Sequence, residues 1–208
     1  MLTVGPFQEN CYIVGNEESG IGVIIDPGDE AARIAVAVER TELDISKIIL
    51  THAHIDHVGA VVDLVNEYSC PVFAHAESAP VLEQLPMQVV MMGMKFGEIP
   101  KIDAYIADGE VVEVGGLRLE SLYTPGHSPG HLAFHIESEG RVIAGDALFA
   151  GSVGRVDLPG GDGPTLLKSI EERLLTLPDE TVVHPGHGPQ TTIGNERATN
   201  PFLQGGLL

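Results

Sequence analysis

Tryptophan is absent from this 208-residue chain, and cysteine occurs only twice, as Cys11 and Cys70. The two cysteines lack the spacing of a zinc site and stand beside apolar residues, so we interpret them as buried thiols rather than disulfide partners. No stretch approaches the roughly 20 apolar residues that cross a bilayer, so we expect no membrane association. The first residues also lack the features of a secretory signal, which favours a cytoplasmic location.

Basic residues are scarce as well. The chain has 11 Lys and Arg against 30 Asp and Glu, which gives a formal net charge of −19. Nucleic-acid binding needs clustered Lys and Arg, so a nucleic-acid partner is not expected. With 43% hydrophobic residues and no linker or internal repeat, residues 1–208 are expected to form one domain. The oligomeric state is left open.

Histidine, in contrast, is concentrated in one short motif. Residues 50–57 read Leu-Thr-His-Ala-His-Ile-Asp-His and directly follow the apolar run Lys47-Ile48-Ile49, which is typical of a buried strand. In extended chain alternate side chains share a side, so His52, His54 and Asp56 are expected to project together. Imidazole and carboxylate are ligands for zinc, iron or manganese. The alternative is a polar loop with accidental histidines.

Three later segments have the same design, with a strand-like run followed by His or Asp. His127 and His131 lie in a Pro- and Gly-rich loop after the run 117–123, and Asp146 ends the run 141–145. His187 follows the run Val182-Val183-His184 in a second Gly/Pro turn. Functional groups commonly lie on loops held by a rigid scaffold, so these segments favour a metal centre.

The remaining pattern predicts a mixed α and β chain. Expected strands cover 2–4, 11–14, 22–25, 47–51 and 71–74, and expected hairpins pair 111–114 with 117–123 and 132–136 with 142–144. Helices are expected over 30–40, 57–68, 77–85 and 165–175. Asp29 is a candidate N-cap for the first of these helices.

The order of these motifs resembles the metallo-β-lactamase superfamily, and within it the short glyoxalase II-like (hydroxyacylglutathione hydrolase-like) enzymes. The resemblance runs from Gln8-Glu9-Asn10-Cys11-Tyr12 to about His187. It implies a four-layer αββα sandwich within the α/β (α+β) class. It further implies two divalent metal ions, with zinc favoured and iron or manganese possible. By position, one ion is held by His52, His54 and His127, the other by Asp56, His57 and His187, and Asp146 bridges both.

The activity that the resemblance implies is hydrolysis of a small-molecule thiolester by a hydroxide shared between the two metals, with Asp56 and Asp146 as the catalytic carboxylates. Metal-bound water has a pKa near 7, so no Ser or Cys nucleophile is needed. A thiolate leaves without prior protonation because the pKa of a thiol is about 8.5. A thiolester therefore suits a site that has no obvious general acid.

Arg155 stands where glyoxalase II enzymes place a basic residue for the glutathione carboxylate. It is expected either to bind substrate or to form an ion pair with Asp157. The C-terminal extension that contacts glutathione in full-length relatives is missing after His187, so the dependence on glutathione is left open.

Two other activities compete with this reading. A persulfide dioxygenase would use one iron held by His52, His127 and Asp146, the facial-triad pattern. A lactonase or β-lactamase is a further alternative. The β-lactamase is disfavoured because an amine leaves less readily than a thiolate.

Several polar residues near the motifs are not expected to be ligands. Asp26 is interpreted either as a hydrogen-bond partner of a ligand imidazole or as a turn former. His131 is expected to have a structural role. His75, His135 and His184 lie in or beside strand-like runs and are expected to be packed or surface histidines. The segment Met87–Phe96 is interpreted as core filling or an oligomer contact, with a lip over the site as the alternative.

Overall fold

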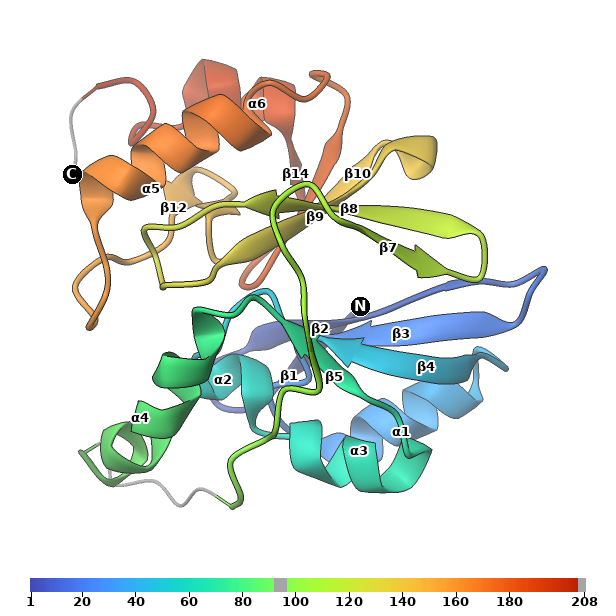
Figure 1. Cartoon of the computed structure of the whole chain (residues 1–208). Coiled ribbons are helices and arrows are strands. Elements are labelled where there is room, and N and C mark those ends of the chain that lie inside the picture. The colour runs from blue at the N-terminus through green and yellow to red at the C-terminus, as the bar shows by residue number, and fades with distance from the viewer. Residues whose placement is uncertain (92–96, 206–208) are drawn as a thin grey trace.

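The computed structural model describes residues 1–91 and 97–205, in which two six-stranded sheets lie face to face (Figure 1). The first sheet comes entirely from the N-terminal half of the chain and has the order β1-β2-β3-β4-β5-β6. Its strands are β1 (Leu2–Val4), β2 (Glu9–Asn16), β3 (Ile21–Ile25), β4 (Asp44–Ile49), β5 (Val72–Ala74) and β6 (Ala104–Tyr105).

The second sheet comes entirely from the C-terminal half and has the order β14-β13-β10-β9-β8-β7. Its strands are β7 (Val111–Val114), β8 (Leu117–Tyr123), β9 (Leu132–Ile136), β10 (Arg141–Gly145), β13 (Val182–Pro185) and β14 (Thr191–Thr192). A separate small ribbon pairs β11 (Leu148–Phe149) with β12 (Ser152–Val153). The two predicted hairpins are confirmed as β7–β8 and β9–β10.

Helices cover the outer face of each sheet. Figure 1 shows α1 (Ala31–Glu39) and α3 (Val61–Tyr68) below the first sheet, and α5 (Gly163–Ser169) and α6 (Ile193–Thr199) above the second. The expected four-layer αββα sandwich is therefore confirmed. The other helices are α2 (Ile55–Val58) and α4 (Ser78–Met91). Among the described residues, no helix is long and apolar enough to cross a membrane.

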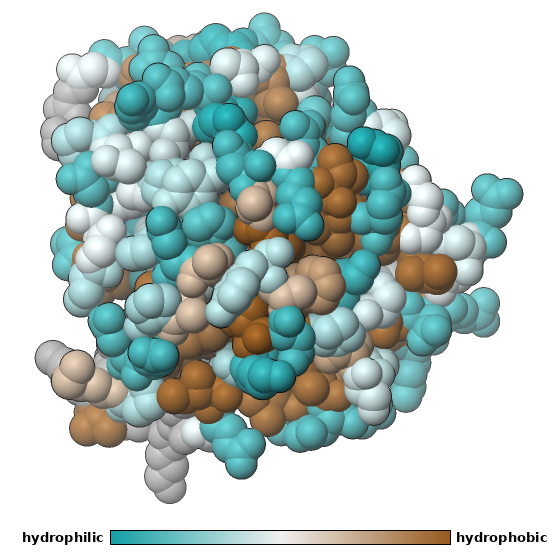
Figure 2. Space-filling view, viewed as in Figure 1, coloured by the Kyte–Doolittle hydropathy of each residue, from teal (hydrophilic) through white to brown (hydrophobic). Residues whose placement is uncertain are grey.

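Three hydrophobic clusters fill the three interfaces between the four layers. Strand β3 shows how the sequence supplies two of them at once. Ile24 belongs to the cluster under α1 and α3, whereas Val23 and Ile25 belong to the cluster between the sheets. A strand that is buried on both faces must be apolar at consecutive positions, which explains the uninterrupted Val23-Ile24-Ile25 run. Hydrophobic residues also reach the surface at the level between the two sheets (Figure 2).

Parallel pairing brings the carboxyl ends of the key strands to one edge of the sandwich. Strands β3 and β4 are parallel, as are β10 and β13, and β8 runs in the same direction as β10 because both pair antiparallel with β9. The chain leaves β4, β8, β10 and β13 at this edge and enters the segments that contain the predicted ligands. The site thus lies where the two halves of the chain meet.

Some local predictions were wrong. Asp29 is not the N-cap of α1, because the helix begins at Ala31 and Glu30 occupies the cap position with a left-handed φ of 53°. Asp29 Oδ1 instead accepts a hydrogen bond from the Glu30 backbone N–H. The helix predicted over 57–68 is interrupted, since the Ala60 N–H donates to Pro27 O and the chain then starts α3. The helix predicted over 165–175, in contrast, is confirmed as α5 followed directly by a π-helical segment, Ile170–Leu174.

Candidate metal centre

Three imidazoles from two distant loops form the first of two neighbouring clusters. His52 Nε2 lies 3.1 Å from His54 Nδ1, and His127 Nε2 lies 3.3 Å from His52 Nε2 and 2.9 Å from His54 Nδ1. All three side chains are buried. Ring nitrogens that converge this closely are arranged to share one partner, and the three-histidine donor set suits a divalent transition metal.

The second cluster consists of Asp56, His57 and His187. His187 Nε2 lies 3.2 Å from Asp56 Oδ2, and its ring stands edge-on to that of His57 with a centroid distance of 5.5 Å. The two histidines come from opposite halves of the chain, one from α2 and the other from the turn after β13. Two imidazoles and a carboxylate are also a suitable donor set for a divalent metal.

Asp146 lies between the two clusters. Its Oδ1 is 3.4 Å from His57 Nε2, and its Oδ2 is 3.6 Å from His127 Nε2 and 3.5 Å from His187 Nε2. Asp146 Oδ1 and His57 Nε2 are both buried, and neither makes a hydrogen bond with the part of the protein that the structure describes. Buried polar atoms are nearly always paired, so this orphaned pair fits coordination of an ion.

The ring nitrogens that point away from the clusters are tied to oxygen atoms. His127 Nδ1 lies 2.8 Å from Arg155 O, and His187 Nδ1 lies 3.1 Å from Phe7 O. A carbonyl can only accept, so in both histidines Nδ1 carries the proton and Nε2 presents its lone pair to the cluster. Such outer partners fix the tautomer of metal-binding histidines and orient their rings.

Asp26 connects the two clusters through hydrogen bonds. Its Oδ2 lies 3.0 Å from His57 Nδ1 and accepts a hydrogen bond from Thr51 Oγ1 at 2.6 Å. The Thr51 hydroxyl, having donated its proton to Asp26, accepts from His52 Nδ1 at 3.0 Å. One buried carboxylate therefore orients a histidine of each cluster. Of the two interpretations of Asp26, the structure supports the hydrogen-bonding one.

Burial controls the protonation of the first cluster. It lowers the pKa of His52 well below the usual range and that of His54 to about 3, and repulsion from neighbouring histidines adds to both shifts. Burial also lowers the pKa of His127, although Asp146 and the hydrogen bond to Arg155 O oppose it. These imidazoles are therefore neutral at pH 7, which is the form that binds metal.

In the second cluster charge interactions outweigh burial. Burial alone would lower the pKa of His57, but the carboxylates of Asp146 and Asp26 raise it. Burial would likewise raise the pKa of Asp146, but His57, followed by His127 and His187, lowers it. Asp146 is consequently ionised and offers two carboxylate oxygens to a cation.

Residues that the sequence placed outside the ligand set have other contacts. His131 accepts a hydrogen bond from the Asp146 backbone N–H at 3.0 Å, and its Nδ1 lies 2.8 Å from Thr124 Oγ1, so it positions the segment that carries Asp146. His75 stacks on Tyr123, and His184 stands edge-on to Tyr12. Met87 is exposed, which argues against core filling there, while Met92, Met94 and Phe96 lie outside the described residues.

Two residues near the centre were missed by the sequence analysis. Thr51 precedes the histidine motif and reads as a polar strand end, yet its hydroxyl connects Asp26 to His52. Glu9 precedes the predicted strand 11–14 and was given no role there, yet it is 1% exposed, and burial raises its pKa to about 10. Its Oε1 lies 3.9 Å from His57 Nδ1. Neither carries a sequence signal, because both act through contacts between segments distant in the chain.

A groove of about 360 Å³ opens over the two clusters. Its apolar walls come from the side chains of Phe7, Ile55, Phe149, Val153 and Leu158. Arg155 also lines the groove, and its guanidinium forms an ion pair with Asp157. Its role in substrate binding stays a prediction.

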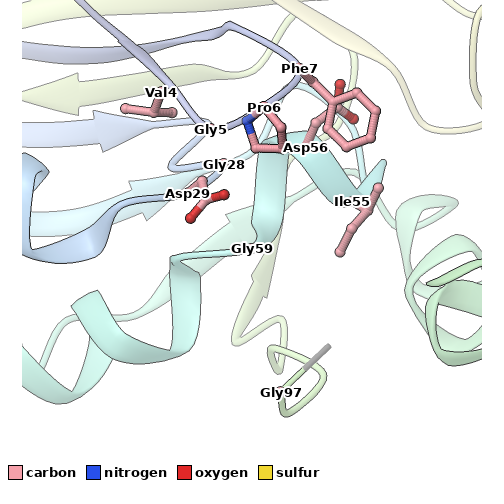
Figure 3. Close-up of a pocket in the computed structure, with 10 residues that line it drawn as sticks. All are labelled: Val4, Gly5, Pro6, Phe7, Gly28, Asp29, Ile55, Asp56, Gly59 and Gly97. Atoms are coloured by element: carbon pink, nitrogen blue, oxygen red, sulfur yellow. The ribbon is translucent and has the colours of Figure 1, made fainter. Parts of the chain in front are cut away.

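A smaller pocket of about 120 Å³ adjoins the groove on the other side of Asp56 (Figure 3). Figure 3 shows the Phe7 ring beside Asp56 and the carboxylate of Asp29 across from them. Gly28 is required here, since a Cβ atom at this position would overlap the carbonyl oxygen of Asp56. This close approach packs the start of α2, and with it Asp56, against the segment after β3 that contains Gly28.

The family comparison agrees with this geometry. Residues 4–187 match the family described as the metallo-beta-lactamase superfamily, which covers all seven predicted ligands. The chain belongs to the metallo-beta-lactamase superfamily. It is therefore a metallo-hydrolase by family, and the paired His and Asp clusters are its candidate metal centre.

Individual members of the superfamily are similar over nearly the whole chain. The hydroxyacylglutathione hydrolase GloC of Haemophilus influenzae is 40% identical over 211 residues, covering 98% of this chain and 96% of that protein. The crystal structure of the BLEG-1 B3 metallo-beta-lactamase superposes with a TM-score of 0.91 at 37% identity, covering 98% of both chains. The structure of TTHA1623 in a di-iron-bound form has a TM-score of 0.88 at 44% identity, covering 97% of this chain and 98% of that one.

Proposed function

We propose that this protein is a two-metal thiolester hydrolase of the glyoxalase II type. The observation that carries the proposal is the position of Asp146, whose two carboxylate oxygens lie against histidines of both clusters. We assign His52, His54 and His127 to one ion, Asp56, His57 and His187 to the other, and Asp146 to both. When bound, two divalent ions would supply a water of lowered pKa and would polarise the acyl carbonyl. Zinc is favoured, with iron and manganese as the alternatives.

The protein's own groups position the reaction. Asp26 and Thr51 hold the imidazoles of His57 and His52 at fixed angles, and Arg155 O holds that of His127. Asp56 and Asp146 are the carboxylates nearest the groove, so a water proton released in the reaction would meet one of them. The walls formed by Phe7, Ile55 and Phe149 would exclude bulk water around an acyl group.

The leaving group favours a thiolester over an amide. Among the described residues that line the groove, no Lys, Tyr, Ser or Cys side chain is available to protonate a departing amine. A thiolate needs no such proton because its conjugate acid has a pKa of about 8.5. The similarity to a relative named hydroxyacylglutathione hydrolase supports a hydroxyacyl thiolester as the substrate.

Metal analysis and a substrate panel test the proposal together. The purified protein would be assayed for bound metals and for hydrolysis of S-lactoylglutathione, a homoserine lactone and a β-lactam. We expect two metal ions per chain and a kcat/KM for the thiolester at least 100 times that for the lactone or β-lactam. One iron per chain together with oxygen consumption on glutathione persulfide would replace this proposal with the dioxygenase alternative. Preference for the lactone or β-lactam would also refute it.

A further inference from the structure

The guanidinium of Arg155 is occupied by its neighbour Asp157 through two parallel hydrogen bonds. Arg155 Nε donates to Asp157 Oδ1 at 2.7 Å, and Arg155 Nη2 donates to Asp157 Oδ2 at 2.8 Å. This Nε–Nη2 edge is one of the two edges by which a guanidinium binds a carboxylate in a bidentate manner. A substrate carboxylate that approaches Arg155 on this edge therefore meets a position occupied by an internal carboxylate.

Arg155 has no substitute within the groove. Among the described residues that line it, Arg155 is the one Lys or Arg, and the other charged groups near neutral pH include the carboxylates of Asp56 and Asp146. The surrounding protein carries a formal net charge of −19. Apart from the proposed metal ions, a ligand with a free carboxylate finds no unpaired cationic side chain among these lining residues until it displaces Asp157.

The rest of the groove suits an uncharged thiol portion. Phe7 is 44% exposed, which is unusual for a phenylalanine, and Phe149 stands edge-on to His187 with a centroid distance of 6.1 Å. Ile55 and Leu158 add further apolar surface. Burial of such side chains against an apolar ligand is favourable and does not depend on charge.

We propose that Asp157 is a specificity-determining residue that competes with substrate carboxylates for Arg155 and so biases the groove toward thiolesters with an uncharged thiol portion. The inference rests on the proposed thiolester activity for its kinetic test, but the competition itself is a property of the groove that ligand binding measures directly. The pair is exposed, with side chains 59% and 69% accessible, so a ligand can displace Asp157 at modest cost.

A purely structural role for the pair makes a different prediction. The Arg155 carbonyl accepts the hydrogen bond from His127 Nδ1, so the Arg155–Asp157 ion pair also holds a loop that orients a candidate metal ligand. If this were its only role, loss of the Asp157 charge would affect every substrate to the same extent. If Asp157 competes with ligands, the loss would favour carboxylate-bearing ligands selectively.

The test compares the metal-loaded protein with its Asp157→Asn variant, which keeps an oxygen acceptor for Arg155 but removes the charge. The first measurement is the calorimetric Kd of S-hexylglutathione, a thioether that cannot be hydrolysed. The second is the ratio of kcat/KM for S-lactoylglutathione to that for the S-lactoyl ester of N-acetylcysteamine, which has no carboxylate. We expect the variant to bind S-hexylglutathione about 3 to 10 times more tightly and to raise the ratio by a similar factor.

The matched control is the comparison of Arg155→Gln with Asp157→Asn/Arg155→Gln, because it removes the same Asp157 charge where no competition for Arg155 is possible. An unchanged Kd in Asp157→Asn, or an equal gain in the double variant relative to Arg155→Gln, would overturn the inference. A tighter Kd without turnover of any thiolester would instead support the competition and refute the proposed activity.

Discussion

Asp26 Oδ2 accepts two hydrogen bonds, one from Thr51 Oγ1 at 2.6 Å and one from His57 Nδ1 at 3.0 Å. Asp26 is not itself a candidate ligand. The two contacts orient one histidine of each cluster. A single substitution below the site is therefore expected to disturb both metal positions.

We expect Asp26→Asn to weaken the binding of both metals by about 10- to 100-fold. The two oxygens of Asp26 together accept from the Thr51 N–H, the Thr51 hydroxyl and His57 Nδ1, and the NH2 group of an asparagine would face at least one of these donors. Competition titration with a chromogenic chelator measures the effect. Asp63→Asn, which removes an exposed carboxylate from α3, is the matched control and should leave both affinities unchanged. Unaltered metal binding in Asp26→Asn would assign Asp26 to the turn alone.

His187→Ala is expected to reduce the metal content from two ions per chain to one. His187 belongs to the second cluster only, with Nε2 3.2 Å from Asp56, and the three-histidine cluster stays intact without it. Inductively coupled plasma mass spectrometry of the purified variant gives the stoichiometry. Retention of two ions, or loss of both, would contradict the assignment of separate clusters.

Asp146→Ala should weaken metal binding at both sites and reduce activity below detection, whereas His131→Ala should retain measurable activity. Asp146 contacts histidines of both clusters, while His131 contacts the Asp146 backbone N–H. Activity and metal content measured side by side distinguish the two roles. If both variants lost activity equally and kept their metals, His131 would have to act on the substrate.

Gly186→Ala is expected to impair metal binding strongly, because the added Cβ would overlap Oδ1 of Asp146 and lie 2.9 Å from His57 Cε1. Gly97→Ala serves as the control, since a Cβ at Gly97 would meet nothing within 4 Å. Metal content and circular dichroism should show a folded Gly186→Ala protein with reduced metal. Normal metal content would mean that Asp146 does not need its observed position.

His184 should make stability depend on pH away from the metal centre. Burial, aided by the charge of Arg141, lowers its pKa from 6.5 to about 4, so the folded state keeps it neutral. The unfolded chain takes up the proton first as pH falls, so the stability from this group is present above pH 6.5 and is lost toward pH 4. The loss is about 2 kcal/mol after allowance for solvent screening.

Urea unfolding of the metal-free protein at pH 7 and pH 4.5, compared with His184→Gln, measures this contribution. Other groups titrate in the same range, so the difference between the two proteins is the relevant quantity. We expect the variant to lose less stability than the parent protein on acidification. If both proteins lost the same free energy of unfolding between pH 7 and pH 4.5, protonation of His184 would not destabilise the folded state.

The apolar runs predicted most of the strands and placed His and Asp side chains at their ends, whereas the four layers and the assignment of seven ligands were implied by the family resemblance. The short strands β6, β11, β12 and β14 were not predicted. The sequence could not predict the hydrogen bonds that orient these ligands. Thr51 and Asp26 are 25 residues apart, and their hydrogen bond depends on β3 and β4 being parallel neighbours. The wrong N-cap at Asp29 has a similar cause, since Glu30 is held by the Gly5 N–H from another segment.

Arg155 shows a different limit. The motif placed it at the groove, and the structure agrees, but its charge is paired with Asp157 two residues away. The sequence left both roles of Arg155 open, substrate binding and the ion pair with Asp157, because the choice depends on side-chain conformation. A guanidinium can reach either partner from the same backbone position.

Because the two sheets come from separate halves of the chain, cleavage between them would give two fragments that each contain one sheet. Four candidate ligands belong to the first half of the chain and three to the second, so bound ions would link the two halves. Cleavage at the exposed turn near Gly109 should then yield two fragments that stay associated while the ions are present. Because the hydrophobic cluster between the sheets also joins the two halves, a chelator should lower the urea concentration at which the two fragments separate.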